Sequence, residues 1–124
     1  MPNPYQHKPI AVFGASENTA KYGYKIFHTL HEQGFTVYGI NPKGGQIDGQ
    51  KLYTDLSQIP GPVEVAILVI APAALIGALT QCQAKGVKEV WFQPGAHSAE
   101  ALAAAQQAGM HAVEACFMAE NGLW

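Results

Sequence analysis

Short apolar runs alternate with longer amphipathic segments along this chain. Five runs have the length and composition of β-strands: Pro9–Phe13, Thr36–Ile40, Val63–Ile70, Lys88–Phe92 and His111–Ala115. The segments between them repeat apolar residues at helical spacing, as in Tyr22, Ile26, Phe27 and Leu30, and again in Leu75, Leu79 and Cys82. Both sets are expected to face the core. This alternation predicts an α/β fold in which helices cover both faces of a parallel sheet.

Three glycines predict where helices end. Gly34, Gly86 and Gly109 each follow a polar segment and immediately precede an apolar run. Glycine just beyond a helix adopts the left-handed backbone conformation without the steric penalty that other residues incur. At helix starts, Pro72 suits a first turn and Ser98 suits an N-cap.

These elements predict one domain, residues 1–124, with a doubly wound, Rossmann-like parallel sheet of five strands in the order 3-2-1-4-5. Val65–Ile70 is apolar throughout, which is typical of a strand covered on both faces. Residues 43–60 are expected to form a long connection with a short turn or helix near Asp55–Gln58. Because ligands bind such sheets beyond the carboxyl ends of the strands, a cleft is expected among four loops: residues 14–18, 41–45, 70–72 and 93–97.

Composition argues against several functions. Hydrophobic residues make up 48% of the chain and charged residues 13%, which is typical of a folded domain. A net charge of −2 gives no electrostatic attraction to nucleic acid or to an anionic membrane. No apolar stretch reaches the roughly 18 residues of a membrane span. A cytoplasmic protein with thiols at Cys82 and Cys116 is expected, and its oligomeric state is left open.

The loop after the first strand has the composition of a phosphate-binding turn. Gly14 permits a sharp turn, and Ala15 and Ser16 are small enough for backbone N–H groups to approach a ligand. The next helix is expected to begin near Thr19, where its N-terminus favours an anion, and Ser16 and Asn18 add side-chain donors. Only the first glycine of the dinucleotide-binding pattern is present, so a tight turn capped by Ser16 or Asn18 is the alternative.

The loop after the second strand offers a lysine where NAD-binding proteins carry an acid. That acid accepts hydrogen bonds from the ribose hydroxyls. Here the loop reads Asn41-Pro42-Lys43, and the next carboxylate along the chain is Asp48. A lysine suits an additional phosphate on the ribose, either the 2′-phosphate of NADP or the 3′-phosphate of CoA. A solvated turn lysine is the alternative interpretation.

Taken together, these segments resemble the CoA-binding domain family, small single-domain proteins similar to the CoA-binding domain of the succinyl-CoA synthetase alpha subunit. The resemblance extends roughly from Ile10 to Met118. Its matching pieces are residues 12–16 (VFGAS), 37–43 (VYGINPK), 49–53 (GQKLY), 90–95 (VWFQPG) and Cys116.

The resemblance implies a domain that binds CoA or an acyl-CoA. The implied diphosphate contacts are Gly14, Ala15, Ser16 and Asn18. The implied adenosine contacts are Lys43 at the phosphate, with Asn41 and Pro42 in the same loop, and Ile70 and Pro72 beside the adenine. The implied pantetheine contacts are Gln93, Pro94 and Gly95.

The sequence shows no convincing catalytic or metal-binding set. In succinyl-CoA synthetase the phosphorylated histidine lies in a separate downstream domain, and this chain has no counterpart to it. His28 and His31 have helical spacing, but no third metal ligand joins them at ligand spacing. His97 and Glu100 are either an acid–base pair in the cleft or an ordinary helix start.

Cys116 allows two interpretations: a small buried side chain, or a thiol near the cleft that could exchange with CoA. The sequence therefore predicts a non-catalytic CoA-binding module that takes a small-molecule ligand. An NADP-dependent oxidoreductase domain is one alternative, and a regulatory domain whose ligand site has lapsed is another.

Overall fold

The computed structural model describes residues 3–124, and it confirms the predicted α/β class. The strands are β1 (Ile10–Phe13), β2 (Val37–Ile40), β3 (Gln46–Ile47), β4 (Gln50–Tyr53), β5 (Val65–Leu68), β6 (Glu89–Phe92) and β7 (His111–Val113). The α-helices are α1 (Tyr22–Glu32), α2 (Leu75–Lys85), α3 (Ala99–Gln107) and α4 (Phe117–Glu120). Two short 3₁₀ turns are η1 (Leu56–Gln58) and η2 (Pro72–Ala74).

The strands form a seven-stranded sheet in the order β3-β4-β2-β1-β5-β6-β7, and only the β3–β4 pair is antiparallel. The prediction of five strands in the order 3-2-1-4-5 is wrong. The third predicted strand, β5, pairs with β1 on the side opposite β2, so Ile10 aligns with both Val37 and Val65. All four β5 residues are buried, and a central position gives such a strand covered faces and two neighbours.

The edge beside β2 is occupied instead by β4, inside the segment expected to be a connection. β4 forms a hairpin with β3 through Asp48-Gly49, with φ of 52° and 76°. Both central residues of a type I′ hairpin turn need positive φ, and Asp-Gly is a preferred pair. The exposed Gln50 and Lys51 of β4 pair with β3, which forms the edge of the sheet. The expected short turn follows as η1, whose first N–H groups are capped by Asp55.

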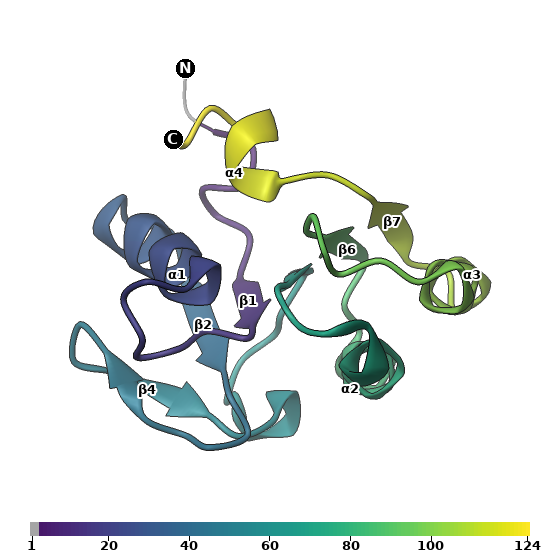
Figure 1. The fold of residues 1–124 in the computed structure, drawn as a ribbon, viewed down its shortest axis with the longest axis horizontal. Coiled ribbons are helices and arrows are strands. Elements are labelled where there is room, and N and C mark those ends of the chain that lie inside the picture. Colours follow the sequence, from purple (N-terminus) through teal and green to yellow (C-terminus); the bar gives the residue numbers. More distant parts are fainter. Residues whose placement is uncertain (1–2) are drawn as a thin grey trace.

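Helices cover both faces of the sheet, as Figure 1 shows, with α1 and α4 on one face and α2 and α3 on the other. Alternate β1 residues point to the two layers. Ile10 and Val12 pack in the α1 layer, and Ala11 and Phe13 pack in the α2 layer. All four are buried, which gives the molecule two apolar cores separated by the sheet.

The predicted helix ends are confirmed. Gly34, Gly86 and Gly109 have φ of 83°, 83° and 80°, in the left-handed region. The Ser98 hydroxyl caps α3 by accepting a hydrogen bond from the Ala101 N–H at 3.2 Å. Pro72 begins η2 immediately before α2, and the predicted core residues Leu75, Leu79 and Cys82 of α2 are buried. Burial raises the pKa of the Cys82 thiol to about 12.

The N-terminal segment from Asn3 onward packs beside α4, close to the C-terminal end of the chain (Figure 1). The Tyr5 hydroxyl donates to Glu89 at 2.5 Å, and the Trp91 indole N–H donates to the same carboxylate at 2.7 Å. Burial and this carboxylate raise the pKa of Tyr5 to about 12. The Tyr5 ring also meets Trp91 and Phe117 edge to face, which fixes the start of α4 against β6.

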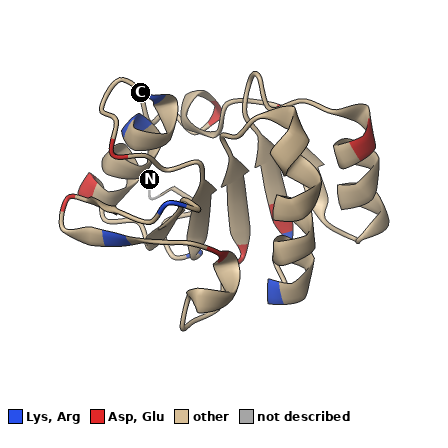
Figure 2. Cartoon of the chain, turned by 60° about the horizontal axis from the view of Figure 1, so that its bottom comes forward, with Lys and Arg blue, Asp and Glu red and all other residues tan. Residues whose placement is uncertain are grey.

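Charged residues are few and lie on many elements, so neither sign gathers over one face in the view of Figure 2. The chain has seven Lys and Arg against nine Asp and Glu. Within residues 3–124, no helix has the length and apolar character needed to cross a membrane.

Candidate functional site

Two glycines let the end of β1, the start of α1 and the end of β5 come close together. Gly14 has φ of 93°, and a Cβ there would lie 2.1 Å from the Val69 carbonyl oxygen. Gly23 lies in the first turn of α1, and a Cβ there would lie 1.9 Å from the Gly14 carbonyl oxygen. Dinucleotide-binding folds use a glycine in this way for close helix–strand packing. Sequence reasoning missed Gly23 because it lies outside the expected glycine spacing.

Hydrogen bonds inside the first loop hold its shape. The Ser16 hydroxyl oxygen accepts from the Asn18 N–H at 3.1 Å, and the Asn18 carboxamide oxygen accepts from the Ala20 N–H at 3.0 Å. The Asn18 carbonyl accepts from the Lys21 N–H at 3.0 Å. These turns leave the Ser16 hydroxyl hydrogen and the Asn18 amide group as donors for a ligand.

The same turns delay the start of α1, which begins at Tyr22 rather than near Thr19 as predicted. Its N-cap residue, Lys21, makes no side-chain capping bond. The first-turn N–H groups of α1 therefore present the partial positive charge of the helix without a protein acceptor on a side chain. The prediction that Tyr22 belongs to the core is wrong, because its side chain is 65% exposed.

Asn41 fastens the second loop to the first. Its side-chain NH₂ donates to the Ala15 carbonyl at 2.9 Å, and its side-chain oxygen accepts from the Lys43 N–H at 2.9 Å. The Asn41 carbonyl accepts from the Gly44 N–H at 2.8 Å. Asn41 thus occupies the position of the ribose-binding acid but has a different role, since its side-chain oxygen is engaged within its own loop.

A carboxylate from the first loop reaches the second loop, which the sequence order did not suggest. Glu17 accepts from the Gln46 N–H at 3.0 Å. A Cβ on Gly45 would lie 2.9 Å from the Glu17 carboxyl carbon, so this glycine makes room for the contact. The Lys43 side chain is exposed at the tip of the same loop.

Two hollows open beside these loops. The Gly14 hollow, of about 420 Å³, is lined by Gly14, Ser16, Ala20, Lys21, Tyr22, Gly23, Asn41 and Val69. The Pro42 hollow, of about 200 Å³, is lined by Phe13, Gly14, Ile40, Asn41, Pro42, Thr54, Ile70, Ala74, Gly77, Ala78 and Gln81.

Two further hollows lie past the ends of β5 and β6. The Cys116 hollow, of about 220 Å³, is lined by Tyr22, Val69, Gln93, Pro94, Cys116 and Trp124. The His97 hollow, of about 220 Å³, is lined by Phe92, Gln93, Pro94, Gly95, His97, Glu114 and Ala115.

Neighbouring hollows share lining residues, so the four form one row along the carboxyl edge of the sheet. Gly14 and Asn41 line both the Pro42 and the Gly14 hollows. Val69 belongs to the Gly14 and Cys116 hollows, and Gln93 with Pro94 belongs to the Cys116 and His97 hollows. A long ligand can therefore follow this edge from the second loop to the end of β6.

Gln93 orders the part of the row formed by the Cys116 and His97 hollows. It is the buried polar residue of the described core, and its side-chain oxygen accepts from the Phe117 N–H at 2.7 Å. This bond holds the start of α4 beside the hollow and leaves the Gln93 amide nitrogen as a donor. Cys116, just before α4, is a free and half-buried thiol that lines the Cys116 hollow, so it lies at the cleft rather than in the core.

The row gathers eight of the twelve residues that the resemblance implied as CoA contacts: Gly14, Ser16, Asn41, Pro42, Ile70, Gln93, Pro94 and Gly95. Four others do not line it: Ala15, Asn18, Lys43 and Pro72. Ala15 is fully buried beneath the loop, and the other three are exposed beside it. Sequence reasoning missed Lys21, Val69 and Trp124, which have no motif of their own and reach the row only through the fold.

His97 has a different partner from the one considered in the sequence. Its Nδ1 atom pairs with Glu114, which follows β7, and not with Glu100 in the first turn of α3. Both members of the pair line the His97 hollow and are substantially exposed. The partner comes from the neighbouring strand, which helical spacing within one segment could not indicate.

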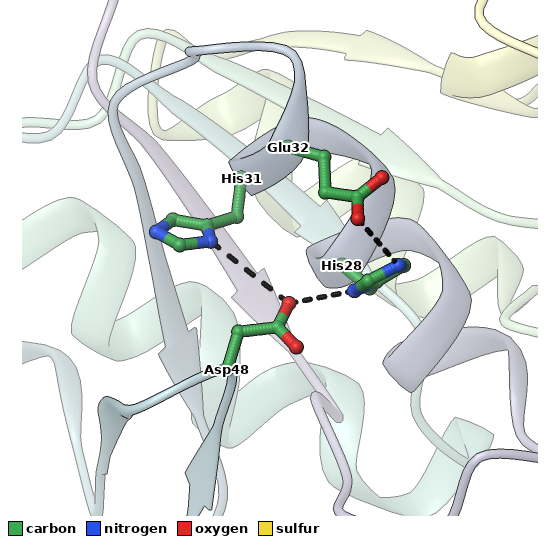
Figure 3. Close-up of polar contacts among 4 residues, drawn as sticks. All are labelled: His28, His31, Glu32 and Asp48. Carbon is green, nitrogen blue, oxygen red and sulfur yellow. Dashed lines mark hydrogen bonds and ion pairs between the residues drawn. The ribbon is translucent and has the colours of Figure 1, made fainter.

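Asp48 joins His28 and His31, as Figure 3 shows. It lies 2.6 Å from His28 Nδ1 and 3.9 Å from His31 Nδ1, and Glu32 lies 3.3 Å from His28 Nε2. The helical spacing of the two histidines could not indicate Asp48, because Asp48 belongs to a separate segment, which the β3–β4 turn brings to α1. No group of three or more such residues in the described part of the chain has the arrangement of a metal site.

The His28–Asp48 contact predicts a pH effect on stability. The hydrogen bond to Asp48 raises the pKa of His28, with a further contribution from Glu32. Because the folded-state pKa of His28 is raised, its protonated form stabilises the fold fully below the unfolded-state pKa of about 6.5. This stabilisation is lost as the pH rises through the higher folded-state pKa. Thermal melts of the wild type and His28→Gln should therefore differ most near pH 6 and converge in alkaline buffer. His111→Gln, at an exposed position, is the control, and a difference that grows with pH would contradict the assignment.

Comparisons with known proteins identify the family of this chain. A family model described as a CoA binding domain matches residues 8–122. The alpha subunit of ADP-forming acetate–CoA ligase II from Pyrococcus furiosus is 39% identical over 87 residues, which are 69% of this chain and 19% of that subunit. The ADP-forming acetate–CoA ligase from Methanocaldococcus jannaschii is 33% identical over 81 residues, 65% of this chain and 12% of that enzyme.

Solved structures share the fold. A hypothetical protein from Pyrococcus horikoshii superposes with a TM-score of 0.89 at 34% identity, over 94% of this chain and 83% of that one. An acetyl-coenzyme A synthetase from Ca. Korarchaeum cryptofilum, in complex with phosphate and ADP, has a TM-score of 0.77 at 30% identity, over 91% of this chain and 26% of that one. This chain spans only a fifth or less of the curated ligases named above. It belongs to the family of CoA-binding domains, as the segments at Gly14, Lys43 and Gln93 indicated.

Proposed function

We propose that this domain binds CoA or an acyl-CoA along the carboxyl edge of its sheet and performs no chemistry on it. The observation that carries the proposal is the N-terminus of α1, which lacks a side-chain cap and opens on the Gly14 hollow. Backbone N–H groups at a helix N-terminus, with Lys21 beside them, favour a diphosphate. Ser16 and Asn18 supply further donors from the loop.

The neighbouring hollows suit the two ends of the ligand. The Pro42 hollow has apolar walls from Pro42 and Ile70, which match the flat faces of an adenine. Lys43, exposed at the edge of that loop, is placed to pair with the 3′-phosphate of CoA. In the other direction, the pantetheine arm runs past Val69 toward Gln93 and Pro94.

A binding role without catalysis is supported by the surroundings of the two nucleophilic side chains in the row. The Ser16 hydroxyl bonds to a backbone N–H, and no described histidine or carboxylate bonds to it or to Cys116. The ligases that the chain resembles are several times longer, so their activity is not carried over to this domain. A cytoplasmic location stays a prediction.

The role of Lys43 can be tested by comparing the affinities for CoA and dephospho-CoA. CoA should bind more tightly than dephospho-CoA, because only CoA has the 3′-phosphate that the lysine ammonium can meet. Lys43→Ala should remove most of this preference, with a loss of about 1–3 kcal/mol for one charge-assisted contact. Isothermal titration calorimetry with both ligands measures it.

Lys51→Ala is the matched control, since Lys51 lies on the neighbouring hairpin and lines none of the four hollows described above. Equal affinities for CoA and dephospho-CoA in the wild type would reject the role of Lys43. Tighter binding of NADP than of CoA in the same titrations would favour the oxidoreductase alternative instead.

A further inference from the structure

Two large aromatic side chains stand exposed at the Cys116 hollow, which lies between the Gly14 and His97 hollows in the row. Tyr22 is 65% exposed and Trp124 is 54% exposed, and their ring centroids lie 6.4 Å apart. The Lys25 ammonium lies 5.5 Å from the centre of the Tyr22 ring and helps to hold that ring in place. Exposed aromatic surface that borders a hollow is a frequent mark of a binding site.

The lining of the Cys116 hollow combines aromatic and apolar side chains with one amide and one thiol. Tyr22 and Trp124 form aromatic walls, and no lining residue of this hollow carries an acidic or basic side chain. Its one amide, that of Gln93, is anchored to Phe117 through its oxygen, which leaves the NH₂ group as a donor. The volume is about 220 Å³. For comparison, an apolar cavity of about 150 Å³ is enough to bind benzene.

The hollow is also continuous with the proposed diphosphate site. Tyr22 and Val69 line both the Gly14 hollow and the Cys116 hollow. A ligand that rests its diphosphate on the N-terminus of α1 therefore directs its pantetheine arm past Val69, and the far end of that arm reaches the Cys116 hollow beside the Tyr22 and Trp124 rings. The group at that end of an acyl-CoA is the acyl group.

We propose that the Cys116 hollow is an acyl subsite, and that the preferred ligand is a CoA thioester of an uncharged, apolar acyl group about as large as a phenyl ring. This inference rests on the proposed function of CoA binding. The aromatic walls bury the acyl group, and the Gln93 NH₂ donates to the thioester carbonyl. A dicarboxylic acyl group would bring an unpaired carboxylate against these walls, which is unfavourable.

Calorimetric titrations with CoA, benzoyl-CoA and succinyl-CoA test the subsite. Benzoyl-CoA should bind about tenfold more tightly than CoA, which corresponds to about 1.4 kcal/mol for burying one aromatic ring. Succinyl-CoA should gain nothing over CoA. Tyr22→Ala and Trp124→Ala should each lower the affinity for benzoyl-CoA several-fold more than the affinity for CoA, so that most of the benzoyl preference is lost.

The Tyr22 and Trp124 variants should fold like the wild type, because both side chains are exposed and outside the core. Tyr22→Phe should retain the preference, since the ring remains, and Ile76→Ala removes a comparable exposed apolar group outside the hollow. Equal affinities for benzoyl-CoA and CoA, or equal losses for all three ligands in Tyr22→Ala, would overturn the acyl subsite while CoA binding stands. If none of the three ligands binds the wild type, the proposed function itself fails.

Discussion

Gly23→Ala should destabilise the fold by about 3 kcal/mol or more, even though alanine is the better helix former by about 1 kcal/mol. The added Cβ would lie 1.9 Å from the Gly14 carbonyl oxygen and 2.7 Å from its carbon. These are backbone atoms at the end of the central strand, and the Gly14 N–H is bonded to the Ile40 carbonyl at 3.0 Å. Relief of the clash must therefore displace α1 from β1. Guanidinium unfolding, monitored by circular dichroism, measures the loss.

Gly77→Ala is the matched control, because it makes the same change in another helix. Gly77 is exposed on α2, and a Cβ there would meet nothing within 4 Å. This variant should be stabilised by up to about 1 kcal/mol through helix propensity alone. If Gly23→Ala behaves in the same way, the close approach of α1 to the loop is wrong, and with it the geometry of the Gly14 hollow.

Lys21→Glu should weaken CoA binding by about 100-fold, the largest functional effect that we expect from one surface substitution. Lys21 lines the Gly14 hollow at the N-cap of α1, where its ammonium adds to the partial positive charge of the helix. The glutamate removes that cation and places a negative charge beside the diphosphate. Because Lys21 is exposed, the thermal stability of the free protein should hardly change.

Lys88→Glu separates this local effect from a general change in net charge. Lys88 is exposed just before β6, at the opposite edge of the sheet from the hollows, and both variants change the net charge by the same amount. Raised salt should weaken wild-type binding more than Lys21→Glu binding. A comparable loss of affinity in both variants would mean that the Gly14 hollow does not hold the diphosphate.

Much of the fold was predictable because its signals are local. A glycine such as Gly86 marks a helix end through its own backbone preference, and Ser98 caps a helix through a neighbouring N–H. The sheet order depended instead on pairing between distant segments. The hairpin of β3 and β4 did carry a local signal in Asp48-Gly49, but its strands are short and half of their residues are polar and exposed, so they were not recognised. That omission placed β5 at the wrong edge.

The site residues also fall into those that a local sequence signal indicated and those that only the fold brings together. Gly14 and Ser16 were found because a phosphate loop has a composition that can be read directly. Gly23 was missed because its requirement comes from the Gly14 carbonyl across the loop. Tyr22 was assigned to the core by periodicity, but it lies at the first position of α1, beyond the part of the helix that packs on the sheet. Trp124 reaches the row of hollows only because the C-terminal segment folds back beside the start of α1.

CoA is proposed to lie along the carboxyl edge of the sheet with its diphosphate at the N-terminus of α1. The most direct test is a titration of the ¹⁵N-labelled protein with CoA, followed by NMR at each backbone amide. We predict the largest saturable shifts at Ser16, Tyr22 and Gly23, with smaller shifts at Gln93 and little change at the opposite edge near Lys88. Saturable shifts centred elsewhere, or none at millimolar CoA, would contradict the claim.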